Sequence, residues 1–450
     1  MKLPWILIAA GLTSCAGSRS GPSGRVAPVA PSPVAVPLSP PPSAAPAPDA
    51  PANLSAGTWD LDRLLVESER RSPALAAERR EIDVATAQVW EASLYPNPSL
   101  LLEYEDGRWL NAPPWQATHR VGVRVPLVVG GRIRAARVAA EADRDVAALR
   151  YTWRRREVVS EVRIAYAELL GARGVRDTAR ASRGVALNAV ASARARLDAQ
   201  VAPEADLLKA SVDLARAEAD LSEAEQRVVS AGRTLVAVSA IPELDPERVL
   251  GAMASAFAVP PWGQVERDGP FRHPLVVIAQ REMEAARLRI DEANAQRRAD
   301  WTLEAKGGVN EDGNGVVSLG LEIPIPIRDN GSAGVAAAEA RRMVAVSRVE
   351  ATRNEVLRRL SALYRPVVLA QERVRRYATE VLPPAKNALE QTRFGHEKGK
   401  FTYLDVLDAQ RTLNEATAAY ATALSELYQA VAEFESYSGM ALVPQPTEGR

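Results

Sequence analysis

The chain has 450 residues, of which 47% are hydrophobic, 5% are aromatic and 25% are charged. Lysine plus arginine and aspartate plus glutamate both number 56, so the chain has no basic field that would attract nucleic acid. Much of the hydrophobic content is alanine, which favours long, closely packed helices. No segment approaches the run of about 18 apolar residues that marks a membrane-spanning helix, so a helical membrane protein is excluded.

The N-terminus has the pattern of a secretory lipoprotein signal. Met1 and Lys2 precede an apolar run over residues 3–12, which ends at Thr13-Ser14-Cys15. The pattern resembles a bacterial lipobox, so we expect a signal peptide over 1–14 and a lipidated Cys15. An unused thiol behind an ordinary cleaved signal is the alternative. Residues 15–57 are rich in proline and alanine and predict an unfolded tether.

The first half then predicts a helix, a hairpin and a long helical pair. A helix over 61–94 ends at Tyr95-Pro96-Asn97-Pro98. Two alternating segments follow, in which apolar and polar residues face opposite ways, as in Leu100, Leu102 and Tyr104 against Glu103 and Glu105. Helices over about 131–198 and 204–239 are joined by a turn at 199–205. The first of these would be about 100 Å long.

The second half repeats the first. VRVPLVVGGRIRAARVAAEA at 123–142 returns as LEIPIPIRDNGSAGVAAAEA at 321–340, and APEADLLKASVDL at 202–214 returns as FTYLDVLDAQRTL at 401–413. Two matches at nearly one spacing indicate an internal duplication. We therefore predict one repeat over 58–240, a second over 241–437 and a tail over 438–450. Pro366 and Pro383-Pro384 are expected to kink or interrupt the helix over 333–394.

The predicted fold is mainly α with a small β part. Long antiparallel coiled-coil helices would form a helical barrel, and each chain would add four strands. Four strands are too few to close a barrel, since the smallest packed barrels have about eight, so several chains would share one. The alternative is an ordinary soluble sheet whose apolar face packs on the chain's own helices.

Over residues 58–437 the chain resembles the TolC-like outer-membrane factors of bacterial efflux systems. The resemblance rests on the duplicated halves, the strand–proline–glycine–helix junctions and the segment RFGHEKGKFTYLDVLDAQRTL at 393–413. YPNPSLLLEYEDG at 95–107, PLVVGGRIRAARVAA at 126–140 and PIPIRDNG at 324–331 look most like the heavy-metal branch of the cobalt-zinc-cadmium type.

This resemblance implies a passive channel and not an enzyme, with no cofactor. Three chains would form a homotrimer with a twelve-stranded barrel in outer-membrane lipid and a long periplasmic tunnel. A periplasmic adaptor and an inner-membrane resistance-nodulation-division pump would deliver the substrate, either heavy-metal cations or an organic compound. Two other classes compete with this interpretation, a periplasmic coiled-coil scaffold lipoprotein and a lipoprotein enzyme.

The resemblance also assigns roles to particular residues. Leu404, Asp405, Asp408 and Arg411 match the constriction at the periplasmic entrance, where rings of carboxylates would favour cations. A solvated helix face with an ordinary Asp–Arg pair is the alternative. The turns that contain Ala202 and Pro203, and Gly395 and Gly399, would contact the adaptor, or they are plain helix-turn-helix connections. Charged residues on the polar strand faces would line the barrel lumen: Glu103, Glu105, Arg120, Arg124, Glu304, Lys306 and Glu322.

Other signals are weak. Trp109 and Trp115 would either join an aromatic belt or pack the outer loop. Residues 395–400 resemble a shortened phosphate-binding loop but follow no strand. His119, His273 and His396 are far apart in the sequence and predict no metal site.

Overall fold

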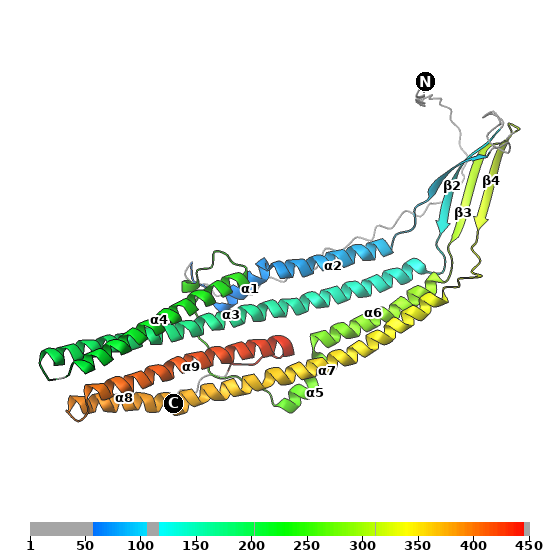
Figure 1. The fold of residues 1–450 in the computed structure, drawn as a ribbon. Helices are drawn as coiled ribbons and strands as arrows, with labels where there is room; N and C mark the ends of the chain where they lie inside the picture. The colour runs from blue at the N-terminus through cyan, green and yellow to red at the C-terminus, as the bar shows by residue number, and fades with distance from the viewer. Residues whose placement is uncertain (1–56, 106–116, 202, 311, 445–450) are drawn as a thin grey trace, which may run out of the picture. The chain divides into compact units, whose positions relative to one another are not determined.

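The computed structural model describes residues 57–105, 117–201, 203–310 and 312–444. The predicted signal peptide, Cys15, nearly all of the linker, Trp109, Trp115, Ala202 and the end of the tail lie outside these residues. In Figure 1 the strands lie together at one end of the long helices. Of the helices in the described part, none is both long and apolar enough to cross a membrane.

The first repeat contains four main helices and two strands, followed by the short helix η2 (Pro246–Arg248). Their bounds are α1 Leu61–Arg71, α2 Pro73–Ala92, β1 Ser99–Glu105, β2 Thr118–Leu127, α3 Arg132–Asp198 and α4 Glu204–Ser239. The expected single helix over 61–94 is wrong, because it breaks between α1 and α2. Ser72 precedes Pro73, which disfavours helical backbone, and its ψ is 118°. Its side chain instead caps α2 by accepting from the Leu75 N–H.

The second repeat has the same order of elements. Their bounds are α5 Trp262–Arg272, α6 Pro274–Gln296, β3 Trp301–Val309, β4 Gly315–Glu322, α7 Ser332–Arg376, the π-helical turn η3 Tyr377–Val381, α8 Leu382–Glu397 and α9 Tyr403–Ser438. α7 continues through Pro366, so the helix is not interrupted there. The interruption occurs only before Pro383-Pro384. A proline ring in a continuous α-helix would clash with the carbonyl four residues before it, and the wider π turn Tyr377–Val381 directly precedes these prolines.

Each repeat has its own apolar core, and the two cores use equivalent positions. The first joins α1, α3, α4 and the segment after α4. The second joins α5, α6, α7 and α9. Buried residues recur 198 positions apart on α3 and α7, as Val158 and Val356, Val162 and Leu360, and Leu169 and Val367. The duplication is therefore one of packing as well as of sequence.

Two tyrosines that lie 198 positions apart, one on each long helix, hold the segment that connects the repeats. The hydroxyl of Tyr166 on α3 donates to the Leu250 carbonyl at 3.1 Å, and the hydroxyl of Tyr364 on α7 donates to the Pro260 carbonyl at 3.0 Å. The segment after α4 packs back on the first core through Ile241, Leu244 and Val249. The predicted boundary between residues 240 and 241 stays a prediction.

The four strands form one antiparallel sheet in the order β1-β2-β3-β4, so β1 and β4 are its edges. Leu102 lies opposite Val121, Val123 opposite Ala305, and Ala305 opposite Leu319, which makes one face apolar across all four strands. This face is open: Leu102 is 76% and Leu319 is 79% exposed. The sheet is thus not covered by the chain's own helices, and the mainly α fold with a small β part is confirmed.

Candidate functional site

The other face of the sheet brings together the seven charged residues that sequence reasoning placed in a lumen. Lys306 Nζ lies 3.0 Å from a Glu304 oxygen and 3.5 Å from a Glu103 oxygen. Arg124 pairs with Glu304, and Arg120 Nη1 lies 3.7 Å from oxygens of both Glu103 and Glu105. Ion pairs therefore bridge β1, β2 and β3 across this face. Glu322 lies at the β4 edge, opposite Thr302.

A glycine makes possible the ion pair that spans from β3 to β1, between Lys306 and Glu103. Gly122 on β2 lies directly opposite Lys306 on β3. A Cβ atom at Gly122 would lie 2.6 Å from Lys306 Cγ and 2.6 Å from the Ala305 carbonyl oxygen. Because there is no side chain here, Lys306 can cross β2 and reach Glu103 on β1. The alternating pattern placed Gly122 on the polar face but did not reveal this role.

At the start of α9, Asp405 caps the helix. Its Oδ2 accepts hydrogen bonds from the backbone N–H and the hydroxyl of Thr402, both at 2.7 Å, and the Thr402 hydroxyl accepts from the Asp405 N–H at 3.3 Å. This is a reciprocal capping box. The hydrogen bond from the Thr402 side chain, and to a smaller extent the one from the Thr402 backbone, lowers the pKa of Asp405. In a single copy, Asp405 therefore stabilises the helix end.

Leu404 and Asp408 lie one turn apart on α9, and both are exposed. Leu404 is 57% exposed. Arg411 does not pair with Asp408; its Nε donates to Glu415 Oε1 at 3.0 Å. Within the described residues the Asp408 carboxylate has no hydrogen-bond or ion-pair partner. Leu404 and Asp408 are therefore the members of the predicted gate that are free to meet other groups.

A chain of polar side chains near this region was not foreseen. Arg393 on α8 donates to Gln410 at 2.6 Å, Gln410 donates to Asn414 at 3.1 Å, and Asn414 donates to Ser182 on α3 at 3.0 Å. Asn414 is only 7% exposed. The chain links α8, α9 and α3 across both repeats. Only the i, i+4 spacing of Gln410 and Asn414 is visible in the sequence.

The two helix-to-helix turns have the same hydrogen-bond geometry. Gln200 after α3 and Gly399 after α8 both have positive φ, at 62° and 70°. In the first turn Val201 N–H donates to the Arg196 carbonyl at 2.9 Å; in the second Lys400 N–H donates to the Gly395 carbonyl at 2.8 Å. Each turn thus ends its helix in a Schellman motif. Gly395 is required for space, since its Cβ would lie 2.2 Å from the Phe401 ring.

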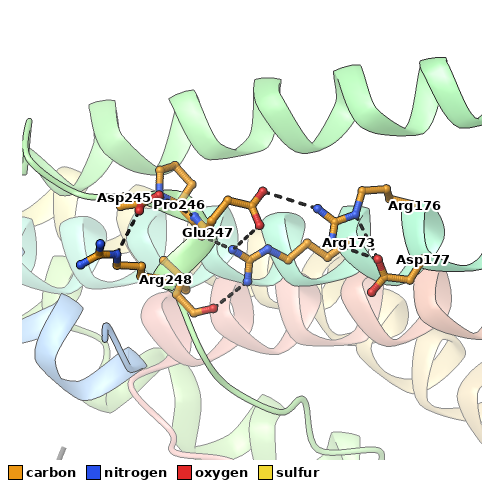
Figure 2. Close-up of polar contacts among 8 residues, drawn as sticks. Arg173, Arg176, Asp177, Asp245, Pro246, Glu247 and Arg248 are labelled. Atoms are coloured by element: carbon orange, nitrogen blue, oxygen red, sulfur yellow. Dashed lines mark hydrogen bonds and ion pairs between the residues drawn. The ribbon is translucent and has the colours of Figure 1, made fainter. Parts of the chain in front are cut away.

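The segment between the repeats is fixed by Arg173 on α3, as Figure 2 shows. Its guanidinium donates to the Val249 carbonyl at 2.6 Å and also to the Pro246 carbonyl. Glu247 lies 3.4 Å from Arg176 and 3.9 Å from Arg173 (Figure 2). These contacts join residues more than 70 positions apart, so no local pattern predicted them.

The histidines do not form a common site. His119 lies in β2, His396 lies in the last turn of α8, and His273 caps α6 by accepting from the Leu275 N–H at 3.1 Å. His273 is fully buried, with its ring 4.5 Å from that of Tyr437, and burial lowers its pKa to about 4. Across the described ranges, no cluster of three or more His, Cys, Asp or Glu side chains could hold a metal ion.

The sequence matches one known protein family in both repeats. Residues 64–240 and 275–440, one segment in each repeat, match the family described as outer membrane efflux protein. The chain is 28% identical over 391 residues to the cobalt-zinc-cadmium resistance protein CzcC of Cupriavidus metallidurans, covering 86% of this chain and 91% of that protein.

Solved structures of outer-membrane proteins share the fold. VceC of Vibrio cholerae is 20% identical with a TM-score of 0.62, over 85% of this chain and 96% of that one. CusC, described as forming a transmembrane channel, is 17% identical with a TM-score of 0.64, over 84% and 95% of the two chains. The predicted outer-membrane efflux channel, as opposed to an enzyme, is confirmed. The chain belongs to the outer membrane efflux protein family.

Proposed function

We propose that this channel carries heavy-metal cations as the outer-membrane part of a tripartite efflux system. The observation that carries the proposal is the likeness to a cobalt-zinc-cadmium resistance protein along 91% of that protein's length. The segments at 95–107, 126–140 and 324–331 agree with it. A metal-efflux channel need not bind its cargo tightly, so a dedicated ligand set is not required.

The conducting unit is a homotrimer. The sheet has two open edges, β1 and β4, and an exposed apolar face that is suited to lipid. Three copies that pair β4 of one with β1 of the next supply twelve strands, enough for a barrel with an aqueous interior. In that arrangement the ion-paired face, with Glu103, Arg120, Arg124, Glu304 and Lys306, lines a hydrated lumen.

Conduction is passive, and its constriction lies at the start of α9. Threefold symmetry turns each exposed Leu404 and Asp408 into a ring of three. A ring of carboxylates favours cations over anions. Asp405 forms a second ring whose members also cap their own helices. Arg411, paired with Glu415, supplies positive charge one turn beyond Asp408.

The adaptor contacts the two turns at the other end of the helices from the strands. Pro203 and Gly399 mark these turns, and Val201 at 73% exposure and Phe401 at 47% offer apolar side chains beside them. A resistance-nodulation-division pump in the inner membrane loads the channel through this adaptor. Cys15, by its lipid, adds an anchor in the outer membrane.

The proposal is tested on a strain that lacks this chain. Tolerance to zinc, cobalt, cadmium, copper and silver is measured beside tolerance to dyes, detergents and antibiotics, with the full-length gene restored as the control. We expect sensitivity to metals alone, reversed by the restored gene. Sensitivity confined to organic compounds would replace the metal proposal with the drug-efflux alternative.

A further inference from the structure

The internal duplication provides a template for a contact that one copy cannot complete. Within the chain, α3 of the first repeat packs along α6 of the second. In the duplication, α7 of the second repeat corresponds to α3, and α2 of the first repeat corresponds to α6. A contact between α7 and α2 would therefore be equivalent to the contact between α3 and α6. In one copy these two helices flank the α2–α3–α6–α7 layer, α2 packing on α3 and α7 on α6.

Two ion pairs fix the contact between α3 and α6. Arg150 Nη2 lies 2.5 Å from Glu282 Oε1, and Arg289 Nη2 lies 2.6 Å from Asp143 Oδ2. The two residues on each helix are seven positions apart and run in opposite directions, as antiparallel packing requires. Between the pairs lie Val146 and Ala285, which are 5% and 2% exposed.

The repeat alignment in this region is fixed by buried residues. An offset of 198 superposes the α3 core on the α7 core, and neither helix is interrupted between that core and Arg150 or Arg348. An offset of 201 relates α2 to α6: Leu75 matches Val276, Ala85 matches Ala286, and the cap Ser72 matches the cap His273. All six of these residues are buried.

These two offsets convert the Arg150–Glu282 pair of the α3–α6 contact into a possible pair between α7 and α2. Arg150 corresponds to Arg348 on α7, and Glu282 corresponds to Glu81 on α2. The other internal pair, Asp143 and Arg289, corresponds to Arg341 and Gln88. The guanidinium of Arg341 can still donate a hydrogen bond to the amide oxygen of Gln88. Both pairs of the α3–α6 contact thus have counterparts on α7 and α2 that can form hydrogen bonds, although Arg341 and Gln88 are not an ion pair.

The same two offsets relate two exposed valines, Val344 and Val84, to residues buried in the α3–α6 contact. Val146 corresponds to Val344, and Ala285 corresponds to Val84. Val344 is 53% exposed and Val84 is 50% exposed, whereas their counterparts are buried. Glu81 and Arg348 are also exposed, and within the described part of the chain neither has a hydrogen-bond or ion-pair partner.

All of these groups lie on one face of the helix layer. A single open cavity of about 800 Å³ is lined by α2, α3, α6 and α7. Its lining includes Arg150 and Glu282 at the centre of the layer and Glu81 and Arg348 on its flanks. The flanking charges therefore lie on the same side as the internal pair that serves as their template.

We propose that Arg348 forms an ion pair with Glu81 of the partner subunit, and that Val344 packs against Val84 of the partner subunit. The occupant of the open α7 face is thus a second copy of this chain. Three such contacts alternate with the three internal Arg150–Glu282 pairs, giving a belt of six equivalent pairs around the helical tunnel. The inference rests on the proposed trimer and adds the residues that join its subunits.

Cross-linking tests the contact in the full-length protein in outer-membrane vesicles. The double variant Glu81→Cys/Arg348→Cys is treated with a short bis-maleimide. We expect covalent dimers and trimers on denaturing gels. The matched control, Arg150→Cys/Glu282→Cys, is expected to cross-link within one chain and remain a monomer on the gel. The single variants Glu81→Cys and Arg348→Cys report any reaction through Cys15 and should give no ladder.

Charge reversal provides an independent measurement. Glu81→Arg and Arg348→Glu are each expected to lower the temperature at which trimers dissociate in mild detergent, and the double reversal is expected to restore it. Arg342→Glu, a charge reversal elsewhere on α7, controls for net charge. If trimers form and conduct ions but no interchain cross-link appears, the pairing is wrong and the proposed function stands. If no trimer forms in the wild-type protein, the proposed function itself fails.

Discussion

At the residue scale, the clearest distinction is between Asp405 and Asp408. Both fit the predicted constriction, but within the described residues only the carboxylate of Asp405 accepts hydrogen bonds, from Thr402. The pattern Thr402-x-x-Asp405 is a capping box that can be recognised in the sequence. The exposure of Asp408 and the pairing of Arg411 with Glu415 depend on helix packing and side-chain choice, which the sequence does not show.

Replacing Asp408 with Ala should raise single-channel conductance and weaken cation selectivity, because in the proposed trimer it would remove a ring of charge from the entrance. Asp408→Glu, which keeps the charge, should retain selectivity. Asp405→Ala should instead weaken the start of α9, at a cost of about 1 kcal/mol for a lost N-cap partner. Planar-bilayer recordings compare the three variants. Wild-type conductance and selectivity in Asp408→Ala would remove this residue from the gate.

His273 predicts a dependence of stability on pH. Burial lowers its folded-state pKa to about 4, against an ordinary value of 6.5. The unfolded chain therefore binds more protons between these values, and stability falls as pH decreases from 6.5 towards 4. The full loss is about 3 kcal/mol, at 1.36 kcal/mol per pKa unit.

The test is thermal unfolding of the detergent-solubilised protein from pH 7.5 to 4.5. His273→Ser reproduces the serine cap that Ser72 supplies in the first repeat, so it should keep the helix start. The variant should have a lower unfolding temperature at neutral pH, because loss of the imidazole ring leaves a cavity. Its unfolding temperature should fall less steeply than that of the wild type as the pH decreases. The same decline in both proteins would show that His273 does not titrate in this range.

At the element scale, local patterns predicted most elements well. The predicted helices over 131–198 and 204–239 are observed at Arg132–Asp198 and Glu204–Ser239. The strand faces also agree, because a period of two survives without tertiary information. The break at Ser72–Pro73 was missed. The interruption expected at Pro383-Pro384 is observed as the π turn Tyr377–Val381, just before these prolines. Each depends on how a proline competes with the neighbouring turn, and α7 shows at Pro366 that the outcome differs between sites.

The turn at Gly399 gives a prediction at this scale. Gly399→Gln should fold, because a Cβ there meets nothing within 4 Å and Gln200 already has the same backbone region in the equivalent turn. The strain of positive φ costs about 1 kcal/mol. The side chain should weaken cross-linking to the adaptor by obstructing the contact surface.

Gly313→Gln is the matched control for this variant. Gly313 has φ of 78° and equally open surroundings, but it lies in the β3–β4 turn. Its substitution should leave adaptor cross-linking at the wild-type level. Equal cross-linking for both variants would place the adaptor contact away from the Gly399 turn.

At the scale of the whole molecule, the duplication was the most productive sequence signal. It predicted two similar halves, and the matching order of elements and the buried pairs Val158/Val356 and Val162/Leu360 show that the halves fold alike. It did not predict the contacts between the halves, such as Ser182 with Asn414 or Arg150 with Glu282. These join residues far apart in the chain, and their side chains meet only once both repeats are folded.

Several features of the molecule have no use in a single copy. The open strand edges, the exposed apolar sheet face and the exposed residues Val84 and Val344 are all liabilities for an isolated chain. Lipid and neighbouring copies cover all of them at once in the proposed trimer.

The most direct test is reconstitution of the purified full-length protein in planar bilayers, with its oligomeric mass measured in the same preparation. We expect trimers that insert and give small, stepwise, cation-selective currents without any energy source. Trimers that insert but pass no current, in both the wild type and Asp408→Ala, would contradict a passive channel gated at α9. Protein that stays monomeric and does not insert would contradict the shared barrel.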